Sequence, residues 1–180
     1  NQYANAIQFY NDSGIIFEQS SREMRLHLDS PFEDILLGDS HKVKGEKVEE
    51  PMDFSKKNFM SIPDQHKFLI QLIFPNQNNS ENQLSLSELD QKFILSKMSM
   101  LPRHSTNPKY GAKYYDGYCK FFMFGDSKAR IPDHIKIFNK VGLAYGFVLD
   151  NAYIIDQKHG VEFFLTAVVY GNRNGVLNDN

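Results

Sequence analysis

The sequence contains no tryptophan, a single cysteine and no excess of charge of either sign. Its 20 Lys and Arg residues balance 22 Asp and Glu residues, giving a formal net charge of -2. This balance does not favour a polyanion-binding protein. The lone cysteine, Cys119, excludes an internal disulfide and a multi-cysteine zinc site. No apolar run approaches the roughly 18 residues that a membrane helix needs. We therefore expect no nucleic-acid partner and no transmembrane segment.

The composition is that of a protein with a packed core. Hydrophobic residues make up 41% of the 180 residues, and 15 Phe and 9 Tyr supply most of the aromatic side chains. This length suits one domain. The first residues include neither an initiator Met nor a signal segment, and the last seven stop in turn-forming residues. We therefore expect residues 1–180 to be one partial domain, cut from a longer protein at both ends.

The first third of the chain predicts exposed β-structure. Two apolar runs flank Asn11-Asp12-Ser13-Gly14, whose residue types suit a tight hairpin turn with a positive φ at Gly14. Residues 38–58 carry mixed charges and few large apolar side chains. This second stretch predicts a solvated loop or an exposed ribbon rather than a functional charge patch.

Two helices are predicted next. The first begins at Ser61-Ile62-Pro63-Asp64, which offers a cap, an early proline and a first-turn acid, and it ends before Pro75. The second begins at Ser85-Leu86-Ser87-Glu88, which has capping-box spacing, and it ends before Pro102. Each carries an apolar stripe that we expect to be core; the stripes are Phe68, Leu69, Leu72 and Ile73, and Leu89, Phe93, Ile94 and Met98.

The C-terminal third predicts a three-stranded antiparallel sheet. Residues 135–141, 145–155 and 161–170 are rich in β-branched and aromatic side chains, and their connections are too short for parallel crossovers. Parts of the last two runs are apolar on both faces, so helices are expected to cover at least one face. The run 118–124 fits either a short helix or a buried strand. Together these elements predict an α+β fold, an antiparallel sheet flanked by helices.

Several residues that could carry chemistry have a simpler interpretation. Gly125-Asp126-Ser127 superficially resembles a nucleophile elbow, but Pro132 lies where the required helix would run, so we expect an ordinary turn. None of the six histidines is paired at metal-ligand spacing. Cys119 lies in an apolar run, where a buried and inert thiol is expected.

The most informative segment is Lys140-Val141-Gly142-Leu143. A lysine at a strand end, followed closely by glycine, places a cation beside exposed main-chain N–H groups and lets a substrate approach the strand edge. The Leu143 N–H, just past the glycine, is suited to hold an oxyanion. A solvated strand lysine beside a hairpin is the plain alternative, and the motif alone is a weak signal.

The same residues resemble the C-terminal part of a class A β-lactamase. The likeness includes Lys140-Val141-Gly142, where that family has Lys-Thr-Gly or Lys-Ser-Gly, and the strand run Asp150 to Ile155. It extends through the last strand, 163–170, and the helices that open at Ser61 and Leu86, covering roughly residues 50 to 175 in matching order. The sequence also resembles β-lactamase-related serine hydrolases of the type found in Bacteroidetes.

This resemblance implies a β-lactamase- or transpeptidase-like fold that is incomplete at both ends. It also implies a periplasmic or secreted location and no metal or organic cofactor. The family's chemistry is acylation of a serine in a Ser-x-x-Lys motif by a β-lactam or peptidoglycan-like substrate. No serine in this sequence has a lysine three residues later, so the nucleophile is expected upstream, outside this chain. Lys140 is then the catalytic cation, while Val141, Gly142 and Leu143 contact the substrate.

Two departures keep other functions open. Val141 lacks the hydroxyl that often holds the substrate carboxylate in this family. No residue is assigned as the deacylating base, because Glu18, Glu23 and Glu33 match the position of that base only by rough location in the chain. Both Ser-x-Asn matches, at Ser80 and Ser105, come too late in the chain and are interpreted as loops. The alternative is a non-catalytic relative that binds a cell-wall peptide or a protein partner, which exposed tyrosines such as Tyr110, Tyr114 and Tyr115 would suit. A structural α+β domain with an accidental Lys-Val-Gly is the third possibility.

Overall fold

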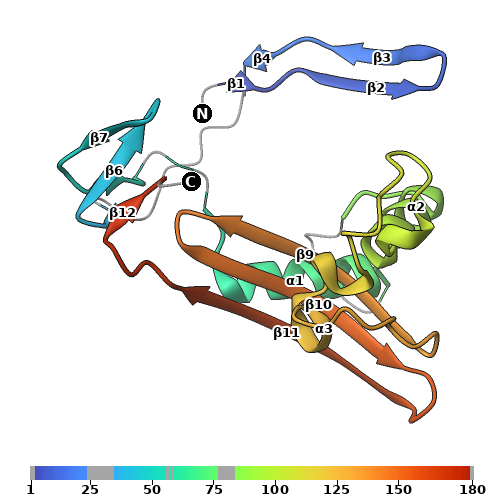
Figure 1. Cartoon of the computed structure of the whole chain (residues 1–180). Helices are drawn as coiled ribbons and strands as arrows, with labels where there is room; N and C mark the ends of the chain where they lie inside the picture. Colours follow the sequence, from blue (N-terminus) through green and yellow to red (C-terminus); the bar gives the residue numbers. More distant parts are fainter. Residues whose placement is uncertain (1–2, 24–34, 56, 58, 77–83, 179–180) are drawn as a thin grey trace. The chain divides into compact units, whose positions relative to one another are not determined.

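The computed structural model describes residues 3–23, 35–55, 57, 59–76 and 84–178. The chain forms two compact units, one made of Asn1–Phe59 with Asn174–Asn180 and the other of Met60–Arg173. The architecture is mixed α+β, with several small, mainly antiparallel sheets and few helices (Figure 1). This mixed class agrees with the prediction from the sequence.

The first unit is built from short strands. Strands β2 (Ile7–Asn11) and β3 (Gly14–Gln19) form the predicted hairpin, and Gly14 has a φ of 125° at its turn. Within the 38–58 stretch, the described residues include the expected ribbon, in which β6 (Ser40–Val43) and β7 (Glu46–Val48) are joined by a turn at Lys44-Gly45. The remaining pairs are β1 (Tyr3–Ala4) with β4 (Arg22–Glu23), β5 (Leu36–Leu37) with β8 (Met52–Asp53), and β6 (Ser40–Val43) with both β7 (Glu46–Val48) and β12 (Val176–Leu177).

The second unit contains the predicted three-stranded sheet. Strands β9 (Ile135–Ala144), β10 (Phe147–Asp156) and β11 (Val161–Tyr170) are antiparallel neighbours, with β10 in the centre (Figure 1). The prediction ended the first strand at residue 141 and placed Tyr145 in the second. Instead β9 continues to Ala144, because Tyr145 and Gly146, with φ of 55° and 82°, form a two-residue hairpin turn.

Helix α1 (Ile62–Ile73) begins at the predicted cap, where the Ser61 hydroxyl accepts a hydrogen bond from the Asp64 N–H. Helix α2 (Glu88–Ser99) begins two residues later than predicted, because the capping box is formed by Ser87 with Asp90. Residues 116–124 form short helical turns, η2 (Asp116–Cys119) and α3 (Phe121–Phe124), after η1 (Pro102–His104). No helix among the described residues is long and apolar enough to cross a membrane.

The two faces of the sheet are covered differently. Helix α1 packs on one face with Leu69 and Leu72 buried, and the Phe74 ring that follows it meets Tyr153 edge-on at 5.6 Å. The other face carries the core cluster of Ile131, Ile135, Ile137, Ala152 and Ile154, against which Leu101, Phe122 and Phe124 pack. As expected, helices cover the sheet.

The apolar stripe predicted as core on α2 is buried only in part, because Ile94 and Met98 are half-buried while the other two members are exposed. Leu89 and Phe93 are 78% and 63% exposed. Helix α2 lies beside the edge strand β9 rather than across a face of the sheet, so it has little apolar surface to pack against (Figure 1). Strand β11 is the opposite edge of the sheet, and it exposes a row of apolar side chains on one face: Val161, Phe163, Leu165 and Val169.

Candidate functional site

The Lys140–Leu143 segment lies on an edge strand whose outward groups can be identified from the hydrogen bonding. The Gln157 N–H donates to the His134 carbonyl, so even-numbered residues of β9 direct their main-chain groups toward β10. The odd-numbered residues point away, and the Ile137 carbonyl accordingly accepts a hydrogen bond from the Lys120 ammonium. The Leu143 N–H, by the same alternation, points outward from the sheet edge.

Lys140 does not end its strand as predicted, because β9 continues through Gly142 to Ala144. Its side chain is exposed, and its Nζ donates to the neighbouring Val141 carbonyl at 2.5 Å. Gly142 shares the face of Lys140, and a Cβ at Gly142 would lie 3.3 Å from Leu149 Cδ2. Because Gly142 has no side chain, nothing projects from this position beside Lys140. The next residue, Leu143, is 74% exposed.

A polar network lies on the same face as Lys140. Asn151, directly opposite Lys140 across the strand pair, donates to the Gln65 carbonyl at 2.8 Å and accepts from the Thr166 hydroxyl at 2.7 Å. The His66 Nδ1 lies 2.8 Å from the same hydroxyl. These bonds tie the first turns of α1 to β10 and β11, so the surface beside Lys140 has a fixed support.

A second network, which we call the Lys120 network, is buried beneath the opposite face of the same segment. It consists of Lys120, Asn139 and Asp150, which are 4%, 7% and 3% exposed. The Lys120 ammonium donates to the Asn139 Oδ1 at 2.5 Å, and the Asn139 Nδ2 donates to the Asp150 Oδ1 at 2.9 Å. The Asn139 amide therefore bridges a buried cation and a buried carboxylate.

Burial dominates the electrostatics of the Lys120 network. It lowers the pKa of Lys120 from its ordinary 10.5 to about 8, and the negative charge of Asp150 only partly opposes this. Burial also raises the pKa of Asp150, against the opposing effect of hydrogen bonds from Asn139 and the Phe122 N–H. Both groups are thus held in a low-dielectric region where each stabilises the charge of the other.

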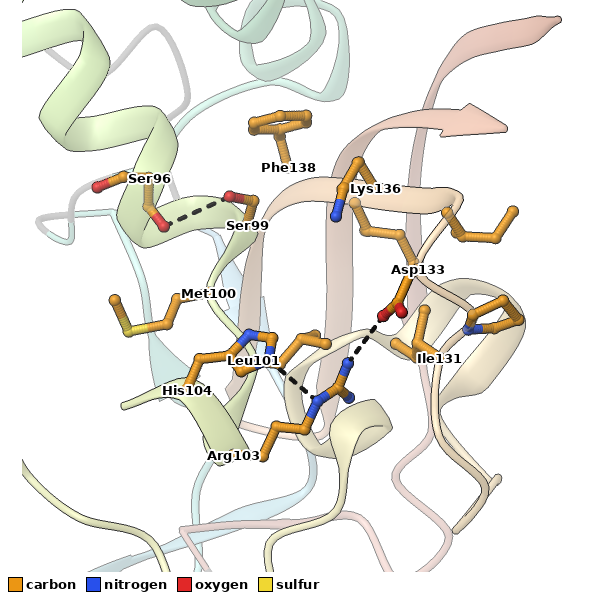
Figure 2. Close-up of a pocket in the computed structure, with 13 residues that line it drawn as sticks. Ser96, Ser99, Met100, Leu101, Arg103, His104, Ile131, Asp133, Lys136 and Phe138 are labelled. Carbon is orange, nitrogen blue, oxygen red and sulfur yellow. Dashed lines mark hydrogen bonds and ion pairs between the residues drawn. The ribbon is translucent and has the colours of Figure 1, made fainter. Parts of the chain in front are cut away.

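A cavity of about 440 Å³ opens between α2, η1 and the first half of β9 (Figure 2). Arg103 lies in its wall, forms an ion pair with the buried Asp116, and approaches Asp133 at 3.7 Å. The cavity reaches along β9 as far as Phe138, so Lys140 is not part of its lining. The lining is Ser96, Ser99, Met100, Leu101, Arg103, His104, Ile131, Pro132, Asp133, Ile135, Lys136, Ile137 and Phe138.

Other residues singled out from the sequence have structural roles or lie elsewhere. Residues 125–127 form the expected turn, in which the Ser127 N–H donates to the Phe124 carbonyl. Cys119 is exposed, so the prediction of a buried thiol is wrong: η2 turns Tyr118 and Cys119 outward while it buries Asp116 and Gly117. In the described part of the chain, no cluster of three His, Cys, Asp or Glu residues could hold a metal ion.

Two of the three acidic candidates belong to the first unit, and one Ser-x-Asn candidate lies in a loop of the second unit. Glu18 lies on β3, where it accepts a hydrogen bond from Gln8, and Glu23 lies on β4, both in the first unit. Ser105 follows η1, and its hydroxyl donates to the Pro108 carbonyl, as expected for a loop. Glu33 and the Ser80 motif fall outside the described residues.

Sequence reasoning missed Lys120 as a partner of the Lys140 segment. Its three acceptors come from positions 98, 137 and 139, which no local pattern connects. The residues around it are apolar or aromatic, so the run by itself predicts only a short helix or a buried strand. A lysine inside such an apolar run was the available signal, because lysine is rarely fully buried without partners.

Comparison with protein-family models, with curated proteins and with solved structures finds no match for this chain. What the arrangement around Lys140 can do chemically therefore follows from its own geometry. That geometry offers an exposed ammonium, an outward N–H and a glycine-flattened surface on one strand edge.

Proposed function

We propose that this chain is the C-terminal portion of a periplasmic or secreted β-lactamase-related serine hydrolase. Its substrate would be a β-lactam or a peptidoglycan-like acyl compound, and the reaction would pass through an acyl-enzyme. The serine and lysine of the Ser-x-x-Lys motif are absent from this sequence and would come from upstream. No metal or organic cofactor takes part in this proposal.

The observation that carries the proposal is the outward direction of the Leu143 N–H on the β9 edge. A main-chain N–H at a free edge is a rigid donor for the oxyanion that forms when a nucleophile attacks a carbonyl. Lys140, three residues earlier, supplies a positive charge for an anionic substrate group. Gly142 lies between them on the Lys140 face, where it adds no side chain that would block the approach.

Val141 limits how tightly this site can bind a substrate carboxylate. It occupies the position where the resembled family has a hydroxyl residue, and it cannot donate a hydrogen bond. Its β-branched side chain preserves the extended backbone. We therefore propose weak binding of ordinary penicillins, with a substrate carboxylate held by the charge of Lys140 instead of by a hydroxyl.

The test is acylation of the complete protein by a fluorescent penicillin or by a chromogenic lactam or cell-wall peptide. Lys140→Ala should lower kcat/KM by about 10 to 1000-fold through lost charge stabilisation. Lys136→Ala is the matched control, because Lys136 is an exposed lysine on the same face of β9. Equal rates for the two variants would show that Lys140 is an ordinary surface residue.

A second candidate function is a non-catalytic relative that binds cell-wall peptide or a protein partner. Three tyrosines favour it: Tyr114 meets Tyr110 and Tyr118 edge-on, with ring centroids 5.1 and 4.8 Å apart. Tyr110 and Tyr118 are 40% and 47% exposed, so this row offers aromatic surface to a partner. Peptide binding by the complete protein without any penicillin labelling would favour this function over the hydrolase.

A further inference from the structure

Every hydrogen-bond donor of the Lys120 network has a partner. The Lys120 ammonium has three N–H groups, and it donates to the Met98 carbonyl at 2.6 Å, the Ile137 carbonyl at 3.0 Å and the Asn139 Oδ1. The Asn139 amide has two N–H groups, which donate to the Cys119 carbonyl at 2.8 Å and to Asp150. Reversing this amide would turn its oxygen toward two acceptors, so its orientation is fixed.

The bonds of the network join elements that are far apart in the sequence. Met98 belongs to the last turn of α2, Lys120 connects η2 to α3, and Asn139 and Asp150 lie on β9 and β10. A buried network with all its groups satisfied is rigid, because any displacement leaves a polar group without a partner in a low-dielectric region. The network therefore fixes β9 against its surroundings.

The point at which β9 is fixed is the start of the candidate site. Asn139 immediately precedes Lys140, and Asp150 lies directly opposite Val141 in the β9–β10 register. The side chains of Asn139 and Lys140 lie on opposite faces of the sheet, because successive residues of a strand alternate. A rotation of β9 about its own axis that moved Asn139 would consequently also move Lys140 and the outward N–H groups beyond it.

We propose that Lys120, Asn139 and Asp150 are positioning residues that hold the Lys140 ammonium and the Leu143 N–H in the geometry needed for substrate. This inference rests on the proposed function for the part that concerns substrate. The three residues are buried and act through the backbone of β9. Their effect on the reaction is therefore indirect, through the placement of Lys140 and Leu143.

Replacing these residues would lower activity even if they only stabilised the fold. The test therefore needs a control residue that is equally buried and has similar hydrogen-bond and ion-pair partners. Asp116 provides it: it is 6% exposed, accepts a hydrogen bond from the Ile131 N–H at 2.9 Å and pairs with a cation, Arg103. Asp150→Asn and Asp116→Asn each remove one buried carboxylate charge and place an amide near a main-chain donor. Of the two carboxylates, Asp150 accepts a hydrogen bond from Asn139, the residue before Lys140, whereas Asp116 bonds Ile131 and Arg103 instead.

The first measurement is hydrogen exchange of the Lys140 and Gly142 main-chain amides in the complete protein, which needs no substrate. Both amides face β10 and report on the pairing of the segment. Asp150→Asn should accelerate their exchange about 10-fold relative to Asp116→Asn, at conditions where the two variants have equal global stability. Exchange rates within 2-fold of each other would overturn the proposal.

The second measurement is the rate of acylation by a fluorescent penicillin or of lactam or cell-wall peptide hydrolysis. Asp150→Asn should lose about 10 to 100-fold, mainly in kcat, because displacement of a site by an ångström costs rates of this order. Asp116→Asn should stay within about 3-fold of the wild type while it remains folded. The same loss in both variants would mean that the network only stabilises the fold.

A double variant separates a coupled network from three independent contacts. If Asn139 couples the two charges, the Lys140 and Gly142 amides of the double variant Lys120→Met with Asp150→Asn should exchange no faster than in the worse single variant. If the contacts are independent, the accelerations caused by the two single substitutions should multiply in the double variant. A wild-type protein that neither becomes labelled nor hydrolyses lactams or peptides would refute the proposed function. The exchange comparison would still decide whether the network holds the Lys140 segment.

Discussion

The contribution of Lys120 to the free energy of unfolding should increase between pH 7 and pH 9.5. Burial lowers the pKa of this lysine from 10.5 in the unfolded chain to about 8 in the folded protein. Between these values the unfolded chain holds a proton that the folded protein has released. Stability rises with pH wherever the unfolded state binds more protons, so raising the pH favours the folded state.

The magnitude follows from the difference between the two pKa values. Each tenfold change in proton affinity corresponds to about 1.4 kcal/mol, so holding Lys120 charged in the interior costs about 3 kcal/mol at neutral pH. By pH 9.5, roughly 2 kcal/mol of this cost is relieved, because the folded amine is then largely neutral. The remainder is relieved only as the pH passes 10.5.

The reference for this measurement is the double variant Lys120→Met with Asp150→Asn, which leaves no ionisable group in the network. The free energy of unfolding of both proteins is measured by urea denaturation at several pH values from 7 to 9.5. The wild type should gain about 2 kcal/mol relative to the double variant over this range. A difference that stays constant within about 0.5 kcal/mol would mean that the ammonium is hydrated, and the reasoning from burial would be refuted.

Local order should change in the opposite direction to global stability. A neutral amine has two N–H groups for the three acceptors around Lys120, so one acceptor loses its donor above pH 8. The main-chain amides of Lys140 and Gly142 should exchange faster than the intrinsic effect of pH requires, although the protein as a whole is more stable. Unchanged protection of these amides at pH 9.5 would contradict the proposed link between Lys120 and β9.

Three further predictions concern packing, backbone and thiol chemistry. Ile154→Ala removes a side chain that is 1% exposed and should cost about 2 to 5 kcal/mol in denaturation experiments, whereas Leu165→Ala, at a position 40% exposed, should cost well under half as much. Gly146→Ala should destabilise more than Gly160→Ala: both have positive φ, but only at Gly146 would a Cβ meet neighbours, the nearest at 3.1 Å. Cys119 should react with a thiol reagent in the native protein nearly as fast as in urea, and strong protection would contradict its exposure.

Local patterns predicted most elements of the fold. The alternation in 135–170 and its short connections were sufficient for the three strands, and the Ser61 cap with Pro63 located the start of α1. The predicted boundaries of β9 and β10 were wrong near Tyr145, because tyrosine favours strands on average. Only the closure of the hairpin gives this tyrosine its positive φ. The predicted α2 stripe is buried only in part for a related reason: periodicity identifies an apolar face but not whether another element covers it.

The candidate site was predicted in part. Lys140 to Leu143 were identified from their own sequence, and their position on an edge strand depends only on the order of three adjacent strands. In the Lys120 network, Lys120 bonds residues that are 17 to 22 positions away in the sequence. Asp150 joins the network through its hydrogen bond with Asn139. Such contacts exist only once α2, η2 and the sheet have packed together, so no local signal contains them.

Strand β11 forms an edge of its sheet among the described residues, and this bears on how the protein behaves during synthesis and purification. Its ten residues contain one charged side chain, Glu162, and neither proline nor glycine, so they lack the features that keep strand edges from joining. A chain that has not finished folding presents this edge as a template for other chains, so losses to inclusion bodies should increase with protein concentration. A charge on its apolar row, such as Val169→Lys at a position 63% exposed, should raise the soluble yield without disturbing the core.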